Sequence, residues 1–112
     1  MKLSIFTDML GCESFEEALQ HTHELGFENI DLRGKLNGST IDTISLEQAK
    51  YLSLLVQENN LKVSSLSSWA VNPCTFTGQP AYRNADENHH IKMSTVLDRL
   101  FDLADIFSTS YI

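Results

Sequence analysis

The sequence is short of long apolar runs, basic residues and cysteines, and each shortage excludes a class of protein. No apolar run approaches the roughly 20 residues that span a bilayer, and the first apolar segment is too short for the core of a signal peptide. Eight basic against fifteen acidic residues give a formal charge of −7. Proteins that bind nucleic acids or anionic membranes do so largely through Lys and Arg side chains. We therefore expect a cytoplasmic protein with no nucleic-acid or membrane partner.

Cysteine and glycine are also too sparse to form recognisable sites. Cys12 and Cys74 lie far apart and show no metal-type spacing, so we expect reduced thiols. The first candidate strand is followed by a single glycine, Gly11, between the acids Asp8 and Glu13. A phosphate-binding turn needs several glycines and no acid, so this loop does not indicate a nucleotide site.

What the chain does contain is a regular alternation of strand-like and helix-like segments. Capping boxes are expected at Ser14 with Glu17 and at Ser45 with Gln48, and Gly26 is expected to end the first helix. The expected strands are 3–9, 29–32, 62–69 and 110–112, and the expected helices are 15–25, 46–59 and a third from Asp86 or Asn88 to Phe107. This β-α-β-α-β-α order implies parallel strands joined by right-handed crossovers.

Two α/β architectures fit that order: a small doubly wound sheet and a part of a (β/α)8 barrel. The missing glycine-rich turn favours the barrel, which makes no such demand on its first loop. We expect residues 1–112 to form a partial TIM barrel, with about three βα units and the start of strand 4.

The segment Leu25-Gly26-Phe27-Glu28-Asn29-Ile30-Asp31-Leu32-Arg33 resembles the xylose isomerase-like TIM barrel family, the sugar phosphate isomerases and epimerases. Residues 2–5, the pair Ile41-Asp42 and the run from Leu97 into Tyr111-Ile112 fit the same family. Many members with different substrates share these features. The resemblance implies a role in carbohydrate metabolism and a full-length protein of about 250 residues, of which this chain would be the N-terminal fragment.

The resemblance also implies a chemistry. Family members bind a divalent metal (Mg, Mn or Zn) through Glu, Asp and His residues of the second half of the barrel. The metal polarises a carbonyl while a carboxylate moves the neighbouring proton. The full-length protein would act on a sugar or polyol. We expect no cofactor in the 112-residue chain, and we expect it to be inactive alone.

Three residues are candidate substrate contacts, and the chain itself offers no catalytic residue. Asp31 and Arg33 share one side of the second strand at its carboxyl end, where barrel sites gather. The alternative is a salt bridge that shapes the rim. Trp69, at the end of the third strand, has a face suited to a sugar ring. The alternative is a tryptophan buried by packing.

Other polar residues carry weaker signals. His21 and His23 point to different faces of a helix and cannot bind one ion together. His89 and His90 are expected at the start of the third helix, as exposed caps or lid residues. The connection over residues 71–86 exceeds the usual 2 to 6 residues, which is typical of a lid or a surface excursion.

A second hypothesis is a non-catalytic module that binds a small molecule or a protein. An incomplete barrel leaves its first and last strands as open edges, and such edges pair with other chains. Self-association through these edges is therefore a possible partner mode. A related nuclease function is disfavoured by the acidic charge.

Overall fold

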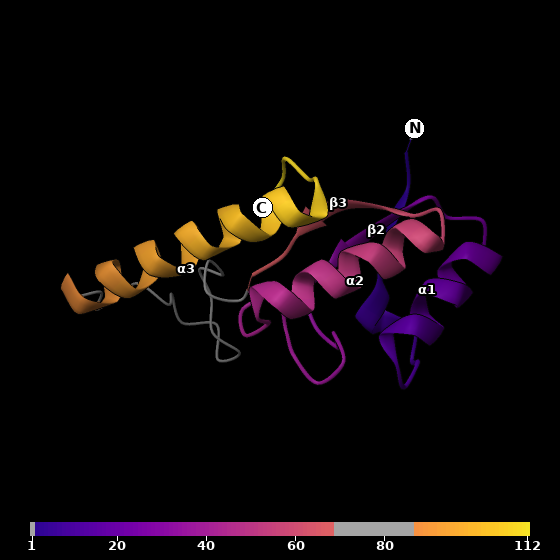
Figure 1. The fold of residues 1–112 in the computed structure, drawn as a ribbon, viewed down its shortest axis with the longest axis horizontal. Helices are drawn as coiled ribbons and strands as arrows, with labels where there is room; N and C mark the ends of the chain where they lie inside the picture. Colours follow the sequence, from indigo (N-terminus) through magenta and orange to yellow (C-terminus); the bar gives the residue numbers. More distant parts are fainter. Residues whose placement is uncertain (1, 69–86) are drawn as a thin grey trace, which may run out of the picture.

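The computed structural model describes residues 2–68 and 87–112, with side chains described for 2–68 and 94–112. The predicted alternation of strands and helices is confirmed over these residues (Figure 1). In chain order the elements are β1 (Ser4–Phe6), the 3-10 helix η1 (Thr7–Met9), α1 (Phe15–Glu24), β2 (Asn29–Leu32), α2 (Leu46–Glu58), β3 (Lys62–Leu66) and α3 (Glu87–Phe107).

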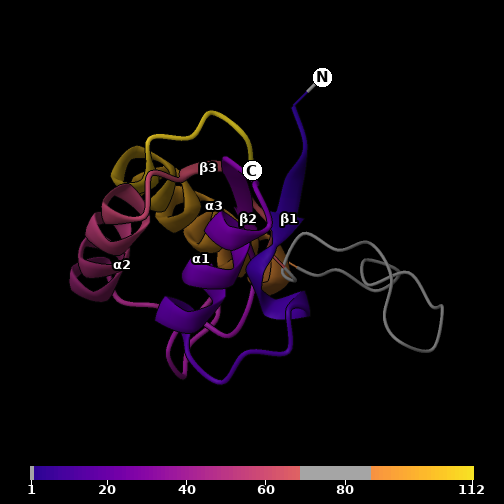
Figure 2. The ribbon, with the colours of Figure 1, turned by 90° about the vertical axis from the view of Figure 1, so that its right-hand side faces the viewer.

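The three strands form one parallel sheet in the order β1-β2-β3. Along β2, Ile30 and Leu32 are fully buried while Asn29 and Asp31 stay partly exposed, as the two-residue period of a strand requires. Apolar side chains of α1, α2 and α3 join Ile30 and Leu32 in a single core. The described helices therefore pack on one face of the sheet, and Figure 2 shows α1 and α2 to the left of β1. The fold is mixed α/β, as expected, with three helices and a three-stranded parallel sheet.

The first two helices begin at the predicted caps. The Ser14 hydroxyl accepts the Glu17 N–H at 3.1 Å, and the Ser45 hydroxyl accepts the Gln48 N–H at 3.1 Å. Gly26 takes a φ of +84° just after α1, a conformation that side chains with a Cβ rarely adopt. The helix thus ends where the sequence places a glycine.

The first strand is shorter than expected. A strand over 3–9 was predicted, but β1 ends at Phe6 and residues 7–9 form a 3-10 turn. The turn carries Asp8 toward Arg33, whose guanidinium donates two hydrogen bonds to it. The Asp8–Arg33 ion pair thus joins this turn to the residue that follows β2.

The third strand also ends early, at Leu66 instead of residue 69. A register shift lies between the pairs Ile30–Val63 and Asp31–Ser65, so Ser64 is an extra residue on β3. The predicted fourth strand is wrong for residues 110–112, which are not a strand. They nevertheless lie beside β3, because the Leu66 N–H donates to the Tyr111 carbonyl at 3.1 Å.

The connection between β2 and α2 is part of the core. Leu36, Ile41 and Ile44 are fully buried although they lie outside any helix or strand. The Asn37 side chain accepts the Phe15 N–H at 3.0 Å, which ties this connection to the first turn of α1. Gln48 holds it from α2 through the Leu36 carbonyl at 3.3 Å.

Several predictions fall outside the described residues. Trp69, Cys74 and the 71–86 connection lie there, and so do the side chains of His89 and His90.

Figure 1 shows the amino-terminal half of α3 extending beyond α2. Among the described residues, no helix combines the length and apolar character needed to cross a membrane.

Candidate functional site

Polar side chains gather at the carboxyl end of the sheet, and we call Asp8, Asp31, Arg33 and Ser65 the rim. The Arg33 guanidinium donates to Asp8 through Nε at 2.9 Å and through Nη2 at 3.1 Å. The side chains of Arg33 and Asp8 are 27% and 13% exposed. Two parallel bonds between a planar guanidinium and a carboxylate fix both groups in orientation. The rim therefore contains one rigid, partly buried ion pair.

Neighbouring groups hold this pair in place. The guanidinium carbon of Arg33 lies 4.6 Å from the centre of the Phe6 ring, which is a cation–π contact. A Cβ placed on Gly34 would lie 3.2 Å from Asp8 Oδ2. The small residue after Arg33 thus lets the Asp8 carboxylate approach the backbone.

The next strand contributes the second half of the rim. Ser65 donates to Asp31 Oδ1 at 2.6 Å, which joins β3 to β2 on the face away from the helices. Beyond β3, Ser68 donates to the Asp42 carboxylate, and Arg99 of α3 donates to the Asp42 carbonyl. Three carboxylates and two guanidinium groups therefore lie around this end of the sheet.

The structure places two of the three predicted substrate contacts in this rim. Asp31 and Arg33 lie at the same end of β2 but bond to different partners, Ser65 and Asp8. Trp69, the third, lies outside the described residues. The salt bridge foreseen as the alternative for Arg33 is present, with Asp8 as its partner.

Asp8 and Ser65 were not among the residues that the sequence predicted as substrate contacts. A usable signal for Asp8 existed, because it follows β1 as Arg33 follows β2. The carboxyl ends of adjacent parallel strands meet at one edge of a sheet. Ser65 carried no such signal, because the register shift that points it toward Asp31 is invisible in the sequence.

The rim does not fit the divalent metal that the family resemblance implies. Both oxygens of Asp8 accept hydrogen bonds from Arg33, whose positive charge opposes a cation at the same carboxylate. Asp31 already accepts a bond from Ser65. Among the described side chains, one other group combines three metal-binding residue types: Cys12, Glu17 and His21.

A hollow of about 660 Å³ lies at the opposite end of the sheet. Its lining includes Asn29 and Lys62, at the amino ends of β2 and β3, and the segment from Phe107 to Tyr111. Ligand sites of parallel α/β sheets form at the carboxyl ends of the strands. We therefore take the rim, and not this hollow, as the candidate site.

Comparison with known proteins identifies no relative: no family model, curated protein or solved structure matches this chain.

Proposed function

We propose that the chain is a sugar- or polyol-binding part of a barrel of the sugar phosphate isomerase/epimerase type. The observation that carries the proposal is the rim, where neighbouring parallel strands present hydrogen-bonding side chains on the face opposite the helices. Rigid carboxylates suit the hydroxyl pairs of a carbohydrate, because a carboxylate accepts several hydrogen bonds at once.

Charge indicates which carbohydrates suit the rim best. The carboxylates in and around the rim come from Asp8, Asp31 and Asp42, while the guanidinium groups come from Arg33 and Arg99. An acidic surround repels phosphate and tolerates neutral hydroxyl groups. We therefore favour an unphosphorylated sugar or polyol over a sugar phosphate.

A titration followed by amide NMR tests the proposal. Pentoses, hexoses and their polyols should shift the amide signals of residues 31–34 and 65–68, and the matching sugar phosphates should shift them less. Asp31→Asn and Arg33→Gln should each weaken binding by about tenfold, since each removes a charged hydrogen-bonding partner. Lys62→Gln, at the other end of β3, is the matched control.

Amide shifts that survive both rim substitutions would contradict the proposal, and so would shifts centred on residues 107–111.

The ion pair between Asp8 and Arg33 is tested separately by urea unfolding. Asp8→Asn and Arg33→Gln should each lower the free energy of unfolding by about 1–3 kcal/mol, and the double variant by less than the sum. An additive double variant would mean that the two groups do not stabilise each other.

The proposal carries an expectation about catalysis. By the family resemblance, the metal ligands and the proton-transferring carboxylate belong to further strands. The pure 112-residue chain should therefore show no epimerisation of the sugars that it binds, with or without added Mg²⁺, Mn²⁺ or Zn²⁺. Metal-dependent turnover by this chain would refute that expectation.

A second candidate function is a binding module that pairs through the sheet edge. Among the described residues β1 has one strand neighbour, β2. The outer side of β3 is partly occupied, because Leu66 bonds to Tyr111 and the Thr109 hydroxyl donates to the Ser64 carbonyl. This observation favours β1 as the edge that would receive another chain.

A further inference from the structure

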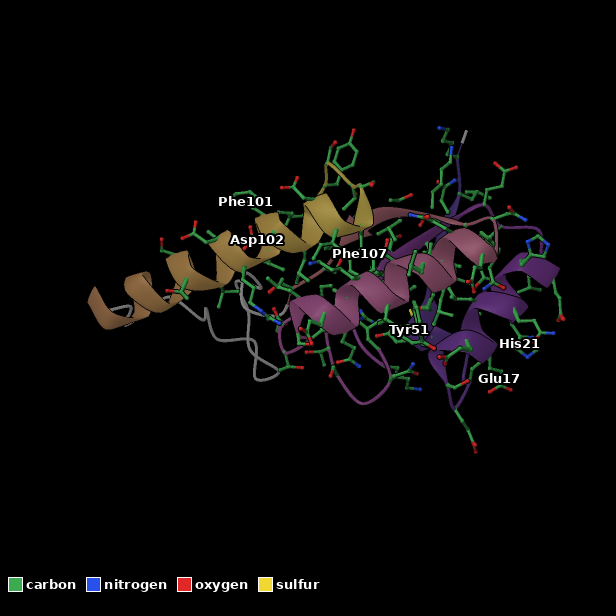
Figure 3. The ribbon with its side chains drawn as sticks, viewed as in Figure 1. Glu17, His21, Tyr51, Phe101, Asp102 and Phe107 are labelled. Carbon is green, nitrogen blue, oxygen red and sulfur yellow. The ribbon has the colours of Figure 1, made fainter. Side chains whose placement is uncertain are left out.

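A second cluster lies away from the rim, where the loop before α1 folds back over that helix. Glu17 and His21 are one helical turn apart on α1, so their side chains project to the same side, and Figure 3 labels both. Cys12 comes from the preceding loop. One potential ligand atom from each of the three residues lies within 4.8 Å of the other two.

The local backbone explains why the cysteine reaches the helix. Gly11 takes a φ of +70°, which turns the chain after η1. The Glu13 N–H then donates to Glu17 Oε2 at 3.1 Å, and the Glu17 N–H donates to the Ser14 hydroxyl. These bonds hold the loop against the first turn of α1, and Cys12 directly precedes Glu13 in that loop.

The histidine also has an orienting partner. His21 Nδ1 lies 3.7 Å from Glu24 Oε2 on the next turn. Carboxylates that contact one ring nitrogen commonly orient the imidazole of a metal-binding histidine. The Glu17 carboxylate is oriented as well, by its bond from Glu13.

From this geometry we propose that Cys12, Glu17 and His21 bind one Zn²⁺ ion, with water in the fourth position. Thiolate, imidazole and carboxylate are the ligands that Zn²⁺ takes in proteins, whereas Mg²⁺ prefers oxygen ligands alone. Bonds of about 2.0–2.3 Å place tetrahedral ligands about 3.5 Å apart. The three atoms must therefore close by little more than about 1 Å, which exposed side chains on a loop and a helix surface can do.

A hollow adjoins the cluster on the Cys12 side. Cys12 and Glu13 border a hollow of about 560 Å³ that Lys35 and the segment from Asn37 to Thr40 also line. Partial burial, then the charge of Glu17, raise the pKa of the Cys12 thiol, while Lys35 lowers it. Zn²⁺ must therefore displace the thiol proton, which is the usual course when a metal binds cysteine.

The site would join the loop to α1. An ion bound to residues of both segments stabilises the folded chain, because the unfolded chain does not hold the three ligands together. We expect Zn²⁺ to raise the melting temperature of the reduced chain, and excess Mg²⁺ to have no such effect. This role does not depend on sugar binding at the rim.

The test is a Zn²⁺ titration of the reduced chain against a chromogenic chelator, with Co²⁺ as a spectroscopic substitute. We expect one ion per chain and a thiolate-to-cobalt charge-transfer band. Cys12→Ser and His21→Ala should each weaken Zn²⁺ binding by at least about tenfold, and Glu17→Gln by less. Cys12→Ser should also abolish the band.

Two substitutions serve as matched controls. Cys74→Ser removes the other thiol of the chain, and His23→Ala removes an exposed histidine from another face of α1. Both controls should bind as the unaltered chain does, with circular dichroism confirming that every variant is folded. Equal affinity in all variants, or an equal loss in the controls, would overturn the proposal.

Discussion

The side chain of Arg33 is held by groups from another segment of the chain. Asp8 supplies two hydrogen-bond acceptors and Phe6 an aromatic face, and both come from β1 and the turn that follows it. A guanidinium fixed in this way loses little further freedom when a ligand arrives. The pair that stabilises the rim is therefore also what makes the rim rigid.

Named neighbours of Cys12 act on the pKa of its thiol. Burial and the Glu17 charge raise the pKa of its thiol, and Lys35 opposes them. Glu17→Gln removes a charge that raises the pKa, so more thiolate forms at a given pH and alkylation by iodoacetamide should speed up by about twofold or more. Lys35→Gln removes the opposing charge and should slow the same reaction.

The alkylation rates are compared in a Cys74→Ser background with a chelator present, so that one metal-free thiol is followed. Glu16→Gln is the control, because the Glu16 carboxylate accepts hydrogen bonds from Asn37 and does not contribute to the shift at Cys12. Rates that move in the same direction in Glu17→Gln and Lys35→Gln would show that these charges do not govern the thiol.

At the scale of elements, the two capping boxes predicted from the sequence differ in what the second partner does. At α1, Glu17 reaches back to the Glu13 N–H, next to the cap. At α2, the Gln48 side chain turns away from the cap and bonds to the Leu36 carbonyl and the Ser39 hydroxyl. Both helices keep their serine cap, but the second side chain adds to the cap at α1 and anchors the β2–α2 connection at α2.

This difference predicts separate effects of two neighbouring substitutions. Ser45→Ala should lower the free energy of unfolding by about 1 kcal/mol through loss of the cap. It should speed hydrogen exchange of the Gln48 amide. Gln48→Ala keeps that cap and should instead speed exchange of the Leu36 amide, which donates to the Ser39 carbonyl at 2.9 Å. Faster exchange at Leu36 in both variants would contradict the assignment.

The sequence predicted correctly those helices and strands whose limits depend on residues close together in the chain. The strand 29–32 and the starts of α1 and α2 agree with the structure because buried alternation, serine caps and Gly26 act within a few residues. The shortened β1 and the register shift at Ser64 depend on partners distant in sequence. No pattern within the strand indicates them.

The connection between β2 and α2 shows the same limit. Gly34, Asn37 and Gly38 predict a loop, and a loop is present. Its burial was not predicted, because Leu36, Ile41 and Ile44 follow neither helical nor strand spacing. For the candidate site, Asp31 and Arg33 were found from their strand, whereas the pairing with Asp8 and Ser65 required the assembled sheet.

For the whole molecule, the decisive feature is a sheet whose described helices all pack on one face. Three parallel strands in sequential order with helices on one side match both a barrel segment and one half of a doubly wound sheet. Either way, β1 has a strand neighbour on one side within the part of the chain that the structure describes, and such a strand edge is where we propose that another chain could pair.

The β1 edge can be tested at the residue that precedes it. Leu3, immediately before β1, is 60% exposed, so an edge-to-edge contact would cover it. We expect sedimentation velocity to show association that increases with concentration, and Leu3→Lys to reduce it, because a lysine at a strand edge disfavours pairing with another chain. Leu54→Lys is the matched control, since Leu54 is 58% exposed on α2, away from the edge. A chain that stays monomeric at all concentrations, or an equal effect of both lysines, would rule out β1 as the assembly edge.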